Sequence, residues 1–266
     1  MTAIEKLYQK LKKNFHICVG LDTDINKIPD YLKKEKNPVL EFNKIVIENT
    51  YNHAAAYKIN FAFYEKDGIK GIENLLSTIE LIPEDILIIG DAKRGDIGNT
   101  SKMYAESIFN TFGCDAVTLH PYMGYDSIEP FLLFKDKLNF ILALTSNNGA
   151  NDFEKLRLKN DKFLFQTIIE KVKEWNFNKN CGIVFGATNV EELKENADIF
   201  GDLIILLPGV GAQGGDLNEV VKIFDEKKNN NYLINVSRSL IYCDDSKDFP
   251  YSVEREIRNL NRIVQS

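Results

Sequence analysis

Charged side chains end or interrupt three short apolar segments of the sequence. Asp22 ends the first segment, and Lys58 lies inside the second, where an unpaired ammonium group would be costly. Asp91 and Lys93 follow the third, Ile86 to Gly90, and their spacing places both side chains on one face of a strand. A carboxylate–ammonium array in a half-buried site is expensive to assemble. Such an array suits a reaction in which negative charge develops on carbon beside a pre-oriented cation.

Each of these residues alone also has an ordinary structural interpretation. An aspartate after an apolar segment often caps a helix, and an Asp-x-Lys pair is often a solvated ion pair. Asp96 follows Lys93 by three residues, in an expected loop beyond Gly95. Because three charged segments would converge at one edge of a sheet, the catalytic interpretation is the stronger one.

Eight short apolar segments alternate with longer stretches of helical periodicity. The apolar segments are Phe15 to Leu21, Ala55 to Phe61, Ile86 to Gly90, Ala116 to His120, Phe140 to Thr145, Gly182 to Gly186, Leu203 to Leu207 and Tyr232 to Val236. Each is mostly apolar on both faces, as expected for buried parallel strands. Helices are predicted at Leu40 to Asn52, Lys162 to Trp175, Asp216 to Phe224 and Val253 to Ile263. The alternation predicts an α/β fold, a (β/α)8 TIM barrel formed by residues 1–266 as a single domain, with a doubly wound open sheet as the alternative.

Two features near the C-terminus suit a phosphate group. Loops after the last two strands of such barrels often bind phosphate. The segment Pro208 to Asp216 is rich in glycine and can turn backbone amides toward an anion, although glycines also simply permit a tight turn. Arg238 follows the last apolar segment and can offer a bidentate fork to phosphate oxygens. His120 ends the fourth segment, and a lone histidine is expected to be structural.

The segment Asp91-Ala-Lys-Arg-Gly-Asp-Ile97 resembles the D-x-K-x-x-D-I motif of orotidine 5′-phosphate decarboxylases, and the resemblance extends in order along nearly the whole chain. It implies catalytic roles for Lys93, Asp91, Asp96 and Lys58. It implies substrate-binding roles for Asp22, Lys58, Ile97, Thr100, Ser146, Pro208, Gln213 and Arg238. Much of the family has glycine before the phosphate-binding arginine, whereas this chain has Ser237, which resembles a second branch with Ser-Arg.

The resemblance implies decarboxylation of orotidine 5′-monophosphate to UMP, the last step of de novo pyrimidine nucleotide synthesis. Lys93 would stabilise and protonate the C6 carbanion, and Asp91 and Asp96 would hold it. The resemblance implies no metal and no organic cofactor. It also implies a homodimer in which the segment from Asp96 to Thr100 is shared across the interface.

Composition limits the other classes of function. The net charge of −6 implies no basic face, so nucleic acid is not an expected partner. No apolar run approaches the roughly 20 residues of a membrane span, and no secretory signal is recognised, so the cytoplasm is the expected location. Two rival functions are a metal-dependent keto-sugar-phosphate decarboxylase and a non-catalytic phosphosugar-binding barrel. A fused phosphoribosyltransferase is not expected, because one barrel accounts for all 266 residues.

Overall fold

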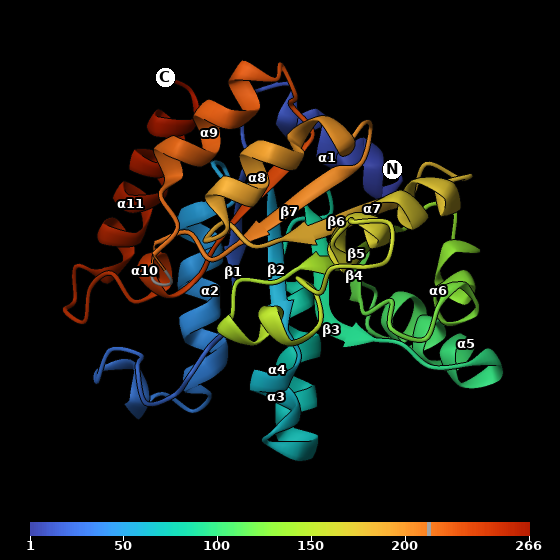
Figure 1. The fold of residues 1–266 in the computed structure, drawn as a ribbon. Coiled ribbons are helices and arrows are strands. Elements are labelled where there is room, and N and C mark those ends of the chain that lie inside the picture. Colours follow the sequence, from blue (N-terminus) through green and yellow to red (C-terminus); the bar gives the residue numbers. More distant parts are fainter. Residues whose placement is uncertain (212–213) are drawn as a thin grey trace.

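The computed structural model describes residues 1–211 and 214–266. Its centre is a closed barrel of eight parallel strands in sequence order, in which the last strand pairs with the first (Figure 1). The strands are β1 (Ile17–Gly20), β2 (Ala56–Asn60), β3 (Leu87–Arg94), β4 (Ala116–Leu119), β5 (Leu138–Leu144), β6 (Cys181–Phe185), β7 (Ile204–Pro208) and β8 (Tyr232–Val236). The predicted TIM barrel is confirmed, and the open-sheet alternative is wrong because the sheet closes.

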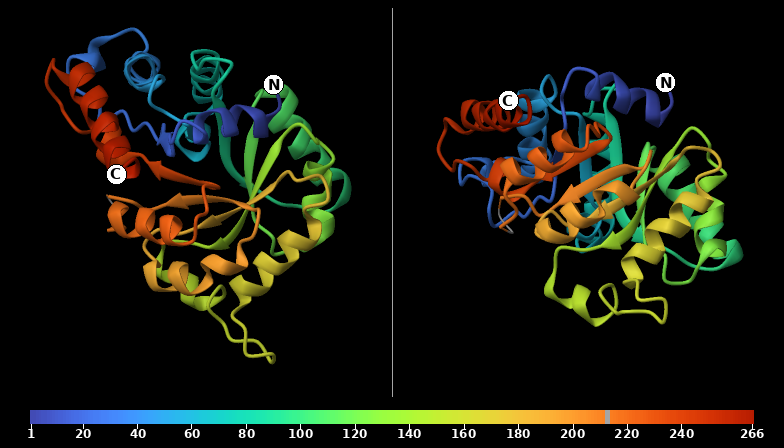
Figure 2. Two further views of the ribbon diagram at one scale, coloured as in Figure 1. Left: turned by 90° about the horizontal axis from the view of Figure 1, so that it is seen from above. Right: turned by 45° about the horizontal axis from the view of Figure 1, so that its top comes forward.

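Helices surround the barrel on its outside (Figure 2). The α-helices are α1 (Ala3–Leu11), α2 (Pro38–Thr50), α3 (Ala62–Glu65), α4 (Gly68–Glu80), α5 (Gly98–Glu106), α6 (Tyr125–Leu132), α7 (Leu164–Trp175), α8 (Val190–Asn196), α9 (Leu217–Glu226), α10 (Arg238–Ile241) and α11 (Phe249–Val264). The short helical turns are η1 (Leu32–Lys34), η2 (Ser107–Thr111), η3 (Asn148–Asp152) and η4 (Ala197–Ile199). The four predicted helices correspond to α2, α7, α9 and α11, each within a few residues of the predicted bounds. None of the described helices combines the length and the apolar character that a membrane crossing requires.

Local sequence signals explain where several helices begin. Thr2 accepts a hydrogen bond from the Glu5 amide while the Glu5 carboxylate accepts one from the Thr2 amide, which is a capping box at the start of α1. Asn37 caps α2, whose first residue is Pro38, and Asp216 caps α9. These caps satisfy backbone donors that a helix start leaves without partners.

Two apolar cores explain why the strands are apolar on both faces. One lies inside the barrel and includes Ala56, Leu87 and Ile89, with residues of α1 packed against it. The other lies between the strands and the outer helices and includes Tyr57 and Ile88. Because side chains alternate along a strand, residues in step with the inner row continue into the barrel mouth. Lys58 continues the row of Ala56, and Asp91 continues the row of Leu87 and Ile89. The fold therefore points these two charges at each other.

Candidate active site

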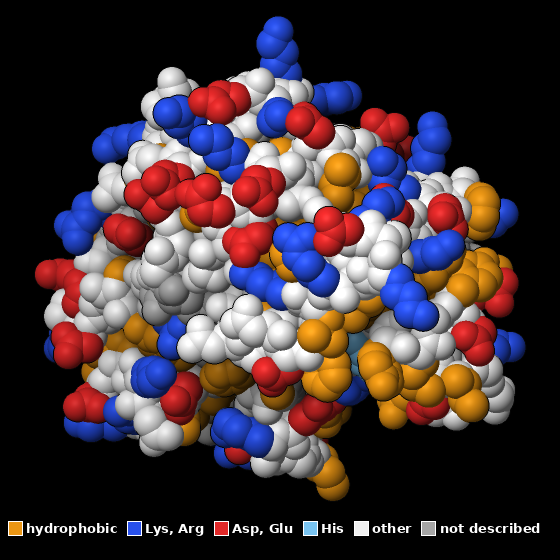
Figure 3. Space-filling model, in the orientation of Figure 1, with side chains coloured by type: hydrophobic (Ala, Val, Ile, Leu, Met, Phe, Trp, Pro, Cys, Tyr) orange, Lys and Arg blue, Asp and Glu red, His pale blue; other side chains and the backbone are white. Residues whose placement is uncertain are grey.

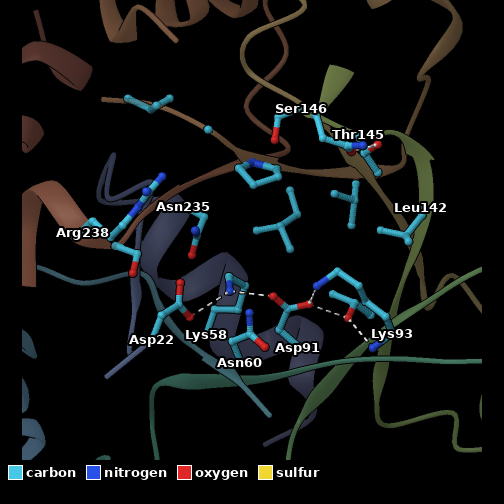
Figure 4. Close-up of a pocket in the computed structure, with 18 residues that line it drawn as sticks. Asp22, Lys58, Asn60, Asp91, Lys93, Leu142, Thr145, Ser146, Asn235 and Arg238 are labelled. Atoms are coloured by element: carbon cyan, nitrogen blue, oxygen red, sulfur yellow. Dashed lines mark hydrogen bonds and ion pairs between the residues drawn. The ribbon is translucent and has the colours of Figure 1, made fainter. Parts of the chain in front are cut away.

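A cavity of about 270 Å³ lies at the carboxyl ends of the strands (Figure 4). All eight strands or the segments that follow them contribute to its lining. The lining residues are Asp22, Lys58, Asn60, Asp91, Lys93, Thr118, Leu142, Thr145, Ser146, Asn147, Val184, Leu206, Pro208, Gly209, Val210, Asn235, Ser237 and Arg238. This is the position at which TIM barrels carry their active sites.

Asp91 is the centre of a chain of ion pairs across one side of the cavity (Figure 4). Its Oδ2 lies 2.8 Å from Lys58 Nζ, and its Oδ1 lies 2.7 Å from Lys93 Nζ. Lys58 Nζ also lies 3.6 Å from Asp22 Oδ1, which is an ion pair beyond hydrogen-bonding distance. Lys58 is only 4% exposed, whereas the Lys93 side chain is 49% exposed. Asp91 therefore holds one buried cation and one that is open to the cavity.

The pairing keeps the buried groups charged. Burial alone would lower the pKa of Lys58, but the carboxylates of Asp22 and Asp91 raise it above its ordinary value. Burial alone would raise the pKa of Asp91, but Lys58 and Lys93 hold it well below its ordinary value. The charge of Asp91 thus contributes stability above its unfolded pKa of about 4, and this contribution is lost only as pH falls through the lower folded pKa.

Strand β3 extends four residues beyond its predicted end at Gly90, to Arg94. Its pairing with β4 shifts register between Gly90 and Arg94, and Lys93 has φ of +46°. The simple alternation predicted for Asp91 and Lys93 is therefore interrupted by a bulge in the strand. Both side chains nevertheless meet in the cavity, as predicted.

The structure describes two of the three residues expected to bind phosphate. Arg238 is exposed at the start of α10 and lines the cavity, and Pro208 lines it at the end of β7. Ser146 follows β5 and also lines the cavity. The backbone beside it is fixed because the Thr145 amide donates to Glu154 Oε2 at 2.6 Å. Gln213 lies outside the described residues.

The segment from Asp96 to Thr100 does not join this cavity within one chain. None of Asp96, Ile97 and Thr100 is among the lining residues. Asp96 Oδ1 accepts a hydrogen bond from the Ile97 amide at 2.8 Å, and Ile97 is 56% exposed. One chain thus brings Asp91 and Lys93 together without Asp96.

Comparison with known proteins decides the family. Residues 16–248 match the family described as Orotidine 5′-phosphate decarboxylase / HUMPS family. The chain belongs to this family. A protein of Christiangramia forsetii named orotidine 5′-phosphate decarboxylase is 50% identical over 252 residues, which cover 94% of this chain and 92% of that protein.

Solved structures agree with the family and the fold. The structure titled Leishmania donovani OMP decarboxylase is 33% identical, with a TM-score of 0.84 and full coverage of both chains. The Leishmania donovani UMP synthase structure is 35% identical, with a TM-score of 0.85 over 99% of this chain. This chain spans just over half of that synthase, 57% of its length.

Several residues of this family member's cavity were not predicted from the sequence. Leu142, Val184 and Leu206 form an apolar side of the cavity, and Thr118, Asn60 and Asn235 add polar groups. The sequence signal that could have identified them is the alternation along each strand. Asn60, for example, lies two residues beyond Lys58 and so points to the same face. His120, which was expected to be structural, does not line the cavity. A Cβ added at Gly95 would fall 2.7 Å from its ring, so the histidine packs closely against that backbone.

Three buried oxygens of the cavity have no hydrogen-bond partner within the described residues. They are Asp22 Oδ1, Asn235 Oδ1 and Ser237 Oγ. A buried acceptor without a donor is costly, so a ligand that supplies hydroxyl donors would be bound favourably here. Asp22 and Asn235 lie between Lys58 and Arg238 (Figure 4), so polar groups fill the space between the charged array and the arginine.

Proposed function

We propose that this chain is an enzyme that decarboxylates orotidine 5′-monophosphate to UMP, the last step of de novo pyrimidine nucleotide synthesis. The observation that carries the proposal is the half-exposed ammonium of Lys93, held 2.7 Å from the buried carboxylate of Asp91. Relatives that carry the decarboxylase name and cover nearly the whole chain support it.

In the proposed reaction the bond between C6 of the pyrimidine and its carboxyl carbon breaks, and the electron pair stays on C6. The Lys93 ammonium stabilises that charge and then donates a proton to C6. Lys93 is left neutral and regains its proton from solvent. Asp91 orients Lys93, and the apolar side chains of Leu142 and Val184 suit the neutral CO2 that departs. The mechanism uses no metal and no organic cofactor.

The remaining cavity residues are assigned to the rest of the nucleotide. Asp22 and Lys58 would bind the ribose hydroxyls, which supply the donors that Asp22 Oδ1 lacks. Ser146 would contact the pyrimidine edge from the segment that follows β5. Pro208 and Arg238 would hold the phosphate, and the family resemblance adds Gln213, which lies outside the described residues. Binding energy from the phosphate can then stabilise the transition state at the distant ring.

The direct test is turnover of orotidine 5′-monophosphate by the purified protein, with and without EDTA. We expect the orotate absorbance to disappear at the same rate in both samples. Loss of this activity with EDTA would contradict the metal-free mechanism, and EDTA-sensitive turnover of a keto-sugar phosphate instead would favour the rival metal-dependent decarboxylase. Absence of turnover with tight phosphosugar binding would favour the non-catalytic barrel.

A second test concerns the phosphate. Arg238→Ala is expected to weaken binding of the nucleotide by about 10- to 100-fold, because charge-assisted hydrogen bonds to phosphate are lost. Binding of the dephosphorylated nucleoside should change little, since it offers no phosphate. Calorimetry with UMP and uridine measures both. Arg258→Ala, which removes an exposed arginine paired with Glu254, is the matched control. Equal losses for UMP and uridine would show that Arg238 acts elsewhere.

We also propose that the enzyme is a homodimer. Exposed apolar side chains gather on α5, on α6 and on the residues next to these helices, at the lower right of Figure 3. They are Ile97, Met103, Tyr104, Tyr122, Met123, Tyr125 and Leu133. Exposed apolar side chains gathered on one side of a protein mark a candidate interaction site. In a twofold dimer, the adjoining Asp96, Ile97 and Thr100 would reach into the partner's cavity.

The proposal also covers the family branch, the cellular location and the partners of this chain. The chain is placed in the branch with Ser-Arg at the start of α10, supported by the close fit of Ser237 against Gly20. A Cβ at Gly20 would lie 2.7 Å from Ser237 Cβ, so glycine at that position makes room for the serine. The cytoplasm is the proposed location. Neither nucleic acid nor a membrane is proposed as a partner.

A further inference from the structure

We propose that Thr118 is a positioning residue for Lys93: its hydroxyl group clamps the backbone of Lys93 to the carboxylate of Asp91. The inference rests on the proposed function, because it assigns Thr118 to the catalytic geometry of that site. It concerns a residue of β4 that is 2% exposed and lines the cavity.

The hydroxyl of Thr118 makes two hydrogen bonds at once. Its Oγ1 accepts from the Lys93 amide at 3.1 Å and donates to Asp91 Oδ1 at 2.8 Å. Asp91 Oδ1 also accepts from Lys93 Nζ at 2.7 Å. Lys93 is therefore attached to the same carboxylate oxygen twice, once through its ammonium and once through its backbone by way of Thr118.

The irregular pairing of β3 explains why such a clamp is needed. Gly90 pairs with Val117 and Arg94 pairs with Leu119, so Thr118 alone faces the three residues between Gly90 and Arg94. In that bulge the Lys93 amide has the Thr118 hydroxyl as its acceptor instead of a strand carbonyl. Lys93 also has φ of +46°, a conformation that residues other than glycine rarely adopt. A strained backbone persists only where its surroundings hold it.

A threonine suits this place because a hydroxyl can accept and donate simultaneously. Valine has nearly the same shape but can do neither. Without the clamp, the Lys93 backbone would lose its acceptor and Asp91 Oδ1 would lose a donor. The ammonium would then no longer be held over C6, and a displacement of about 1 Å can cost on the order of a hundredfold in rate. Substrate binding through Asp22 and Arg238 would be largely unaffected.

The experiment compares Thr118→Val, Thr118→Ser and Thr50→Val in turnover of orotidine 5′-monophosphate. Thr50 is a buried threonine outside the cavity, and its hydroxyl bonds to the Val46 carbonyl and the Tyr57 hydroxyl. We expect Thr118→Val to lower kcat by about 10- to 100-fold with KM within about threefold. Thr118→Ser, which keeps the hydroxyl, should stay within about threefold of wild type in kcat. Thr50→Val should lose thermal stability and keep its kcat.

A crystal structure of Thr118→Val gives a reading that does not depend on turnover. We expect Lys93 to leave the left-handed conformation or its Nζ to move away from Asp91. If Thr118→Val does not fold, Thr118→Ala removes the same hydroxyl and takes its place. A kcat for the hydroxyl-free variant within threefold of wild type overturns the proposal, as does equal impairment of Thr118→Ser. If the wild-type protein shows no turnover, the proposed function fails. The role of Thr118 is overturned separately if the backbone conformation of Lys93 and the position of its Nζ are unchanged in the variant structure.

Discussion

Replacing Lys93 with alanine is expected to reduce turnover of orotidine 5′-monophosphate by more than about a thousandfold. Of the two lysines in the charged array, Lys58 is buried and engaged with Asp22 and Asp91, whereas Lys93 is half-exposed to the cavity. Alanine removes both the cation that would face the developing carbanion and the proton that C6 would receive. Lys58 cannot substitute, because the carboxylates on both sides raise its pKa and disfavour proton release.

The loss should occur without unfolding. An ion pair of a half-exposed lysine contributes at most about 1 kcal/mol, and Asp91 keeps its bond to Lys58. Thermal stability should stay level or rise, since functional charge clusters are often strained. Lys171→Ala is the matched control: its side chain is 51% exposed and its Nζ lies 2.7 Å from Glu174. Residual activity of Lys93→Ala within tenfold of wild type would remove Lys93 from its assigned role.

The barrel was predictable because its strands are buried on both faces. Their apolar segments are short and bounded, and the alternation with helical periods has few other solutions. The same signal failed at the end of strand β3, where the strand reaches the cavity. Strand β3 was predicted to end at Gly90, because the polar residues from Asp91 to Arg94 break the apolar pattern, yet the strand continues through them.

The charged residues of the cavity could be predicted from the sequence, whereas most of its neutral residues could not. Asp22, Lys58, Asp91 and Lys93 were identified because a charge in an apolar segment is costly and so carries information. Thr118 gave no such signal, since threonine is common in strands. Its importance depends on the bulge in β3, which only the pairing register reveals. In the proposed dimer, the position of Asp96 relative to Lys93 would be set by assembly and not by the spacing of the two residues along the chain.

Mixing two inactive variants is expected to restore activity if Asp96 serves the partner's site. Lys93→Ala and Asp96→Ala should each be inactive as homodimers, because every site then carries one lesion. In a mixed dimer, one site carries both lesions and the other carries none. With random exchange of equal amounts, half of the dimers are mixed, so about a quarter of all sites regain wild-type composition.

The control pairs Lys93→Ala with Asp91→Ala. Asp91 Oδ1 lies 2.7 Å from Lys93 Nζ within one chain, so both residues belong to the same site. Every site of such a mixed dimer retains one lesion, and no activity should return. The control thus separates complementation across the interface from contamination by wild-type protein.

Activity near one quarter of wild type in the first mixture, and none in the control, would assign Asp96 to the partner's cavity. This outcome would also explain why Asp96 does not line the cavity of its own chain and why the neighbouring Ile97 is exposed. If mass spectrometry confirms subunit exchange and the first mixture stays inactive, Asp96 acts within its own chain. The segment from Asp96 to Thr100 would then have to turn inward on substrate binding, and the apolar surface on α5 and α6 would need another partner.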